Sequence, residues 1–62
     1  MINMTHGDVK TVVKTAAKFR QECGTSGEYL DFVEILLGND FPEDVYDDNE
    51  DFIGDLFDAA MA

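Results

Sequence analysis

Carboxylates are the groups through which this sequence could do chemistry. Its 62 residues include 14 Asp and Glu against 4 Lys and Arg, which gives a formal charge of −10. Residues 1–27 have a balance of +2, whereas residues 28–62 contain twelve acidic residues and no basic one. Direct binding to nucleic acid or to an anionic membrane surface is not expected, because both need a positively charged surface.

One acidic pattern resembles a calcium site in part. Asp47-x-Asn49-x-Asp51 matches ligand positions 1, 3 and 5 of an EF-hand loop. Position 6 is then Phe52 in place of the Gly that the sharp turn requires, and position 12 is Asp58 in place of the bidentate Glu. The sequence therefore favours a solvated acidic stretch, and it predicts no metal site and no cofactor.

Groups for catalysis are sparse. His6 and Cys23 are the only histidine and cysteine, and on one helix they would be about 25 Å apart at 1.5 Å per residue. There is no Gly-rich phosphate loop, Ser–His–Asp set or His-Glu-x-x-His pattern. Paired carboxylates could perform acid–base catalysis only in a pocket, for which so small a chain has little room. We expect no enzymatic activity.

A row of aspartates is the most informative pattern. On a helical wheel, five of them fall within about 80° of one another, and acids three or four positions apart are about 5–6 Å apart. Such a row approximates a line of phosphates, which follow each DNA strand every 3.4 Å or so. The row consists of Asp44, Asp48, Asp51, Asp55 and Asp58, and the predicted partner-binding set adds Asp47, Glu50, Glu28, Asp31 and Glu34.

These acids predict a basic protein as the partner, in particular a nucleic-acid-binding protein or enzyme whose cleft the carboxylates would occupy in place of nucleic acid. A plain solvated face that keeps the chain soluble is the alternative. It does not explain why residues 28–62 lack Lys and Arg, since mixed signs stabilise helices through i,i+4 pairs.

An apolar face offers a different mode of binding. Phe52, Leu56 and Phe57 lie among acids, a pattern typical of segments that fold on a partner or form a homodimer. The same spacing is also that of a helix packed on the chain's own core.

The elements that would position these groups are helices. Helices are predicted over residues 5–23, 25–37 and 49–60, with a possible short helical turn after Pro42, and there is no β pattern. Thr5 with Asp8, and Thr25 with Glu28, have capping-box spacing. The sequence therefore predicts an all-α protein, a compact three-helix bundle forming a single domain over residues 1–62.

Helical periodicity also predicts the buried faces. The first helix would bury Val9, Val12, Val13, Ala16, Ala17 and Cys23. The second would be the central element, with Leu30 and Ile35 widening an apolar stripe of Tyr29, Phe32, Val33, Leu36 and Leu37. The third would bury Val45, Tyr46, Phe52, Ile53, Leu56, Phe57 and Ala60.

The setting is expected to be cytoplasmic. A single cysteine excludes an intramolecular disulfide, and residues 1–8 have neither the basic nor the apolar region of a signal peptide. In size, charge and lack of catalytic groups, the chain resembles the small acidic inhibitors that viruses of bacteria use against host nucleic-acid enzymes, and acidic immunity proteins that neutralise toxic nucleases. The resemblance is one of type and covers no alignable motif, so it implies no residue roles.

Overall fold

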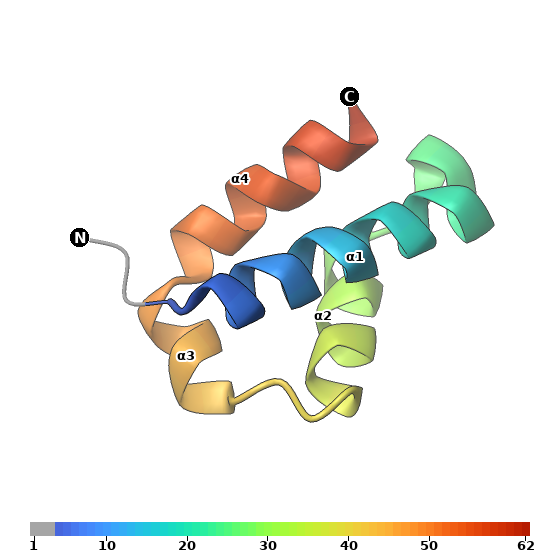
Figure 1. Ribbon diagram of the computed structural model, residues 1–62. Helices are drawn as coiled ribbons and strands as arrows, with labels where there is room; N and C mark the ends of the chain where they lie inside the picture. The colour runs from blue at the N-terminus through green and yellow to red at the C-terminus, as the bar shows by residue number, and fades with distance from the viewer. Residues whose placement is uncertain (1–3) are drawn as a thin grey trace.

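Four α-helices and one 3₁₀ turn make up the part of the chain that the computed structural model describes, residues 4–62 (Figure 1). They are α1 (His6–Cys23), η1 (Gly24–Ser26), α2 (Tyr29–Gly38), α3 (Glu43–Asp48) and α4 (Glu50–Met61). No strand occurs in this range. The prediction of an all-α bundle of three main helices with a short helical turn after Pro42 is confirmed. Met1, Ile2 and Asn3, part of the segment without signal-peptide features, lie outside the described residues.

The start of α1 is held by the predicted capping box. The Asp8 backbone N–H donates to Thr5 Oγ1 at 3.1 Å, and the Thr5 N–H donates to Asp8 Oδ2 at 3.3 Å. Both bonds satisfy N–H groups that the first turn of a helix otherwise leaves without acceptors. The helix ends at Gly24, whose φ of 65° is favourable only for residues such as glycine.

The second predicted capping box is absent. Thr25 lies in η1, and α2 begins at Tyr29 with Glu28 as an N-cap whose side chain makes no capping hydrogen bond. Gly27, just before α2, has an extended backbone that runs so close to the Phe19 ring that a Cβ there would collide with it. The segment between η1 and α2 is therefore packed against α1.

Asn49 separates α3 from α4. Its φ of −125° and ψ of 25° interrupt the helix, while its side-chain Nδ2 donates to the Val45 carbonyl at 2.9 Å. Residues 44–60 therefore belong to two helices, in agreement with the predicted short turn after Pro42 and the separate helix over residues 49–60. Asn49 occupies the N-cap position of α4, and its side chain bonds back to α3.

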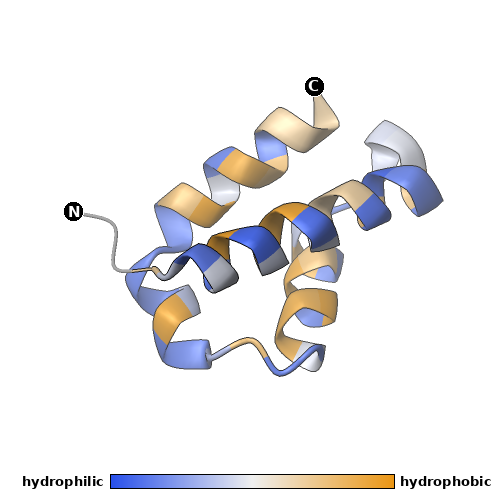
Figure 2. Cartoon of the chain, viewed as in Figure 1, coloured by the Kyte–Doolittle hydropathy of each residue, from blue (hydrophilic) through white to orange (hydrophobic). Residues whose placement is uncertain are grey.

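The core is built from one side of each main helix, and polar and apolar residues alternate along the ribbon accordingly (Figure 2). Aromatic rings from three helices meet in it. The Phe57 ring centroid lies 5.0 Å from that of Phe32, 6.0 Å from Phe19 and 5.3 Å from Tyr29. The buried apolar residues are Val12, Ala16, Phe19, Phe32, Leu36, Phe41, Ile53 and Phe57.

The buried faces were predicted too broadly. Val13, Ala17 and Cys23 of α1 are exposed, and in α2 Leu30 is 71% exposed and Ile35 42%. The central element is α1, which packs against both α2 and α4, so α2 is covered over a narrower sector than its apolar composition suggested (Figure 1). Phe19, Thr15 and Phe41 are buried residues that periodicity did not single out.

Two glycine substitutions test this packing. Gly27→Ala should lower the free energy of unfolding by about 1–3 kcal/mol, because the Phe19 ring would have to shift from its packing against Phe32 and Phe57. Gly54→Ala is the matched control. No heavy atom lies within 4 Å of a Cβ there, so it should raise that free energy by about 0.5–1 kcal/mol through better helix propensity. Urea unfolding followed by circular dichroism measures both, and an unchanged midpoint for Gly27→Ala would contradict the close approach.

Candidate partner-binding surface

All ten carboxylates predicted to bind a partner are exposed, and we call them the acidic surface. They come from three helices and one cap. Glu28 caps α2, which carries two more, while α3 carries three and α4 carries four. The acidic surface consists of Glu28, Asp31, Glu34, Asp44, Asp47, Asp48, Glu50, Asp51, Asp55 and Asp58.

The break at Asn49 changes the shape of this surface. A straight row of five aspartates requires one continuous helix, but α3 and α4 run in different directions (Figure 1). Asp44 and Asp48 therefore form a pair on α3, and Asp51, Asp55 and Asp58 form a row on α4. The carboxylates are spread over an area of the molecule and do not follow one line.

No cation neutralises these acids within residues 4–62, where no ion pair joins a basic side chain to a carboxylate. All four basic residues lie on α1. Arg20 is the one that reaches α4, where its Nε donates to the Ala60 carbonyl at 3.2 Å. It bonds a carbonyl of the last turn, where a cation is favourable to the helix dipole, and leaves the aspartates of α4 uncompensated.

Helix stability explains some of the acids but not others. Glu50 and Asp51 occupy the first turn of α4, where the helix dipole favours negative charge. Asp58 lies near the carboxyl end of the same helix, where the dipole disfavours it, and the last turn carries no basic residue. Asp55 and Asp58 therefore contribute nothing to the stability of α4 through the dipole.

The apolar residues considered for partner binding are divided between core and surface. Phe57 is 7% exposed and belongs to the aromatic cluster, so its ring is not accessible to a partner in the folded chain. Leu56 is half-buried and packs against the core, and Phe52 is half-buried.

A tyrosine pair that the sequence did not reveal lies beside the acidic surface. The Tyr29 and Tyr46 hydroxyls are 3.2 Å apart and join α2 to α3. Burial, the hydrogen bond with Tyr46, and the nearby charges of Tyr46, Glu50 and Asp51 raise the pKa of the Tyr29 hydroxyl well above its ordinary value of 10.0. Because the two tyrosines are 17 positions apart, only the tertiary fold brings them together.

The candidate catalytic residues and the EF-hand-like segment lie on helices. His6 and Cys23 are the first and last residues of α1, and both are exposed. Residues 50–58 of the EF-hand-like segment are helical. Among residues 4–62, no three His, Cys, Asp or Glu side chains are grouped so that they could hold a metal ion. Nor does any helix of that range combine the length and apolar character needed to cross a membrane.

No protein family, curated protein or solved structure that was compared with this chain matches it. A function for this chain must therefore be inferred from its own residues, above all from the acidic surface.

Salt should stabilise the isolated protein if the acidic surface is uncompensated. Raising ionic strength from about 0.01 M to about 1 M shortens the Debye length from about 30 Å to about 3 Å, which screens repulsion among the carboxylates. Each 1 kcal/mol of relieved repulsion corresponds to a rise of about 4–8 °C in Tm for a chain of this size. Thermal melts at increasing NaCl concentration test this. A triple variant that combines Asp51→Asn, Asp55→Asn and Asp58→Asn should show a smaller rise in Tm with salt. A falling Tm would contradict it.

Alkaline pH should destabilise the fold through Tyr29. Its pKa is raised in the folded state, so its stabilising effect is complete below pH 10 and is lost as pH rises above that value. Tyr29→Phe should flatten this loss in urea unfolding between about pH 9 and pH 11. Tyr46→Phe should retain most of the loss of stability at alkaline pH, because burial is the largest cause of the raised Tyr29 pKa. Equal slopes for the parent protein and Tyr29→Phe would contradict the assignment, since the two proteins differ in no other titratable group.

Proposed function

We propose that this protein is a small acidic, non-catalytic inhibitor or regulator that binds a basic nucleic-acid-binding protein or enzyme. The acidic surface would enter the partner's cleft and exclude nucleic acid by occupying its place. One observation carries the proposal: residues 28–62 expose twelve carboxylates, ten of them in the acidic surface, without a single Lys or Arg among them.

Helix stability does not account for that arrangement. Lysine or arginine one turn away from each acid would stabilise the helices. The chain instead places Asp58 where the dipole of α4 opposes it, in a last turn that has no basic residue of its own and is met only by Arg20 of α1 at the Ala60 carbonyl. Acids that cost stability in the free protein are expected where a partner supplies the missing positive charge.

The division of the acids between α3 and α4 supports a cleft as the partner's binding site. The pair on α3 and the row on α4 point along different directions, so their carboxylates can contact basic groups on more than one wall. Long-range attraction would steer the two proteins together, which raises the association rate and makes binding sensitive to salt. A cytoplasmic setting, where cysteines stay reduced, fits the single exposed Cys23.

A charge-matched pair of variants tests the acidic surface. The first variant combines Asp48→Asn, Asp51→Asn, Asp55→Asn and Asp58→Asn. It changes the net charge from −10 to −6 and should weaken partner binding by at least about thirtyfold at low salt. The control carries Ala17→Lys, Gln21→Lys and Glu22→Lys on the exposed side of α1, which also gives −6 and should weaken binding far less. Equal losses of affinity in the two variants would contradict the proposal, because they would mean that binding depends on net charge and not on the acidic surface.

The assay begins with affinity capture from a host extract at low salt and elution with a salt gradient. Basic nucleic-acid-binding proteins should elute together, and the free chain should compete with double-stranded DNA for each of them. Binding that does not depend on salt would contradict the proposal. So would a captured protein that holds DNA and this chain at the same time.

A protein-interaction module or homodimer that uses the Phe52 and Leu56 side of α4 is the second proposal. It is supported by the partial exposure of these two residues, whereas Phe57 belongs to the core. Sedimentation analysis separates the two proposals. A dimer that persists at high salt and is disrupted by Phe52→Ala more than by any single Asp→Asn change would favour the second.

A further inference from the structure

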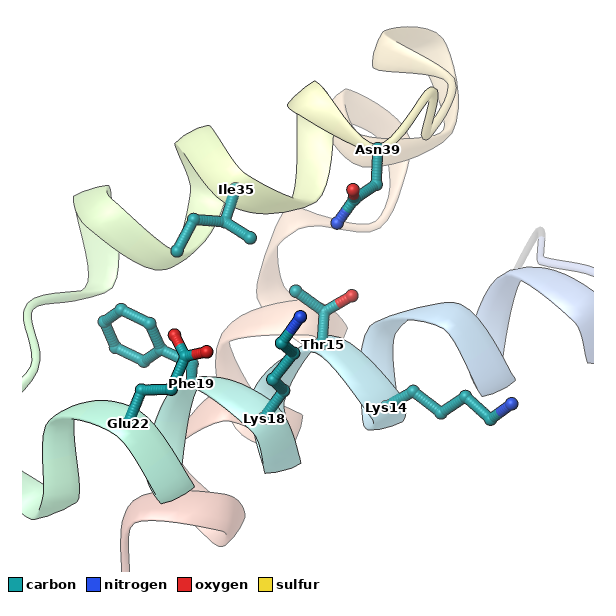
Figure 3. Close-up of a pocket in the computed structure, with 7 residues that line it drawn as sticks. All are labelled: Lys14, Thr15, Lys18, Phe19, Glu22, Ile35 and Asn39. Atoms are coloured by element: carbon teal, nitrogen blue, oxygen red, sulfur yellow. The ribbon is translucent and has the colours of Figure 1, made fainter.

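A hollow of about 350 Å³ lies between α1 and α2 (Figure 3). Lys14, Lys18 and Glu22 line it from α1, and Ile35 lines it from α2. Lys18 is two positions from Arg20, which places it about 160° around α1 from the residue that contacts α4. The hollow therefore opens on a different side of α1 from the contact with α4.

The charge of the hollow differs from that of the molecule. Two lysines and one glutamate are among its lining residues, and without Lys14 the remaining Lys18 and Glu22 balance each other, in a chain of −10. Neither lysine forms an ion pair within residues 4–62, although acidic residues are abundant. In Figure 3 the Lys18 side chain extends into the space between the two helices, and the Glu22 side chain extends toward it beside the Phe19 ring, while that of Lys14 extends away along α1. Lys18 is thus the cation available to an occupant.

The remaining lining is apolar on one side and polar on the other. Ile35 is 42% exposed and forms the apolar wall, and Phe19, 3% exposed, lies beneath it. Thr15 donates its hydroxyl proton to the Thr11 carbonyl at 2.7 Å, so it offers only lone pairs to an occupant. The Thr15 and Asn39 side chains point into the same space as Lys18 (Figure 3).

We propose that this hollow binds a small monocarboxylate with an aliphatic body, a function separate from that of the acidic surface. The carboxylate would bond the Lys18 ammonium, and the body would lie along Ile35 above Phe19. A volume of about 350 Å³ is at the lower end of the range for ligand sites, which suits a small molecule. Multiply charged anions are disfavoured, because Glu22 and the overall charge of −10 would repel them.

Octanoate, kept below the concentration at which it forms micelles, is the probe. Titration followed by ¹H–¹⁵N correlation spectra should give saturable shifts centred on the backbone amides of Lys14, Lys18, Ile35 and Asn39. Octanol should bind at least about fivefold more weakly, because it lacks the charge that Lys18 would pair. Saturable shifts centred elsewhere, shifts that do not saturate, or equal binding of octanol would each overturn the proposal.

Three variants locate the site. Lys18→Gln and Ile35→Ser should each weaken octanoate binding about fivefold or more, the first through lost charge and the second through lost apolar contact. Lys10→Gln removes a lysine from the same helix that does not line the hollow, and it should change the affinity less than about twofold. Circular dichroism confirms that each variant is folded. An equal loss for Lys10→Gln and Lys18→Gln would overturn the proposal, because it would mean that the carboxylate responds only to the general charge of α1.

Discussion

The contact on which the rest of this molecule depends is a cluster of aromatic rings at the meeting point of three helices. Phe19 comes from α1, Phe32 and Tyr29 from α2, and Phe57 from α4, with the ring centroids of Phe32 and Phe57 only 5.0 Å apart. Tilted and edge-on rings at such separations add favourable quadrupole interactions to the burial of large apolar surfaces. In a chain of 62 residues with a charge of −10, this cluster is the main force that opposes repulsion between acidic helices.

The cluster also determines where the acids lie. Ile53 and Phe57 turn one side of α4 toward the core, so Asp51, Asp55 and Asp58 must occupy the other side. The Phe19 ring acts in the same way on the backbone, because it leaves no room for a side chain at position 27, just before α2. Core and surface are two sides of the same helices, and a change in the orientation of α4 would alter both.

Local signals predicted structure correctly where no distant contact interfered. Thr5 with Asp8 and Thr25 with Glu28 have equal spacing, yet only the first pair forms a capping box. The second pair fails because η1 and the extended Gly27 occupy the place of the first predicted turn. The exposure of the five aspartates of the row was predictable from their common side on a helical wheel. The division of that row at Asn49 agrees with the predicted separation of a short turn after Pro42 from a helix over residues 49–60.

By itself, the sequence determined the helical class, the approximate extent of the main helices and the concentration of negative charge beyond residue 27. These properties follow from the order of residues along the chain, since periodicity, capping and charge are local. Only the tertiary structure decided that α1 is the central helix, that Leu30 and Ile35 stay exposed, and that Lys18 and Ile35 line one hollow. The physical reason is that a pattern identifies the apolar side of a helix, whereas the packing of its neighbours decides how much of that side is covered.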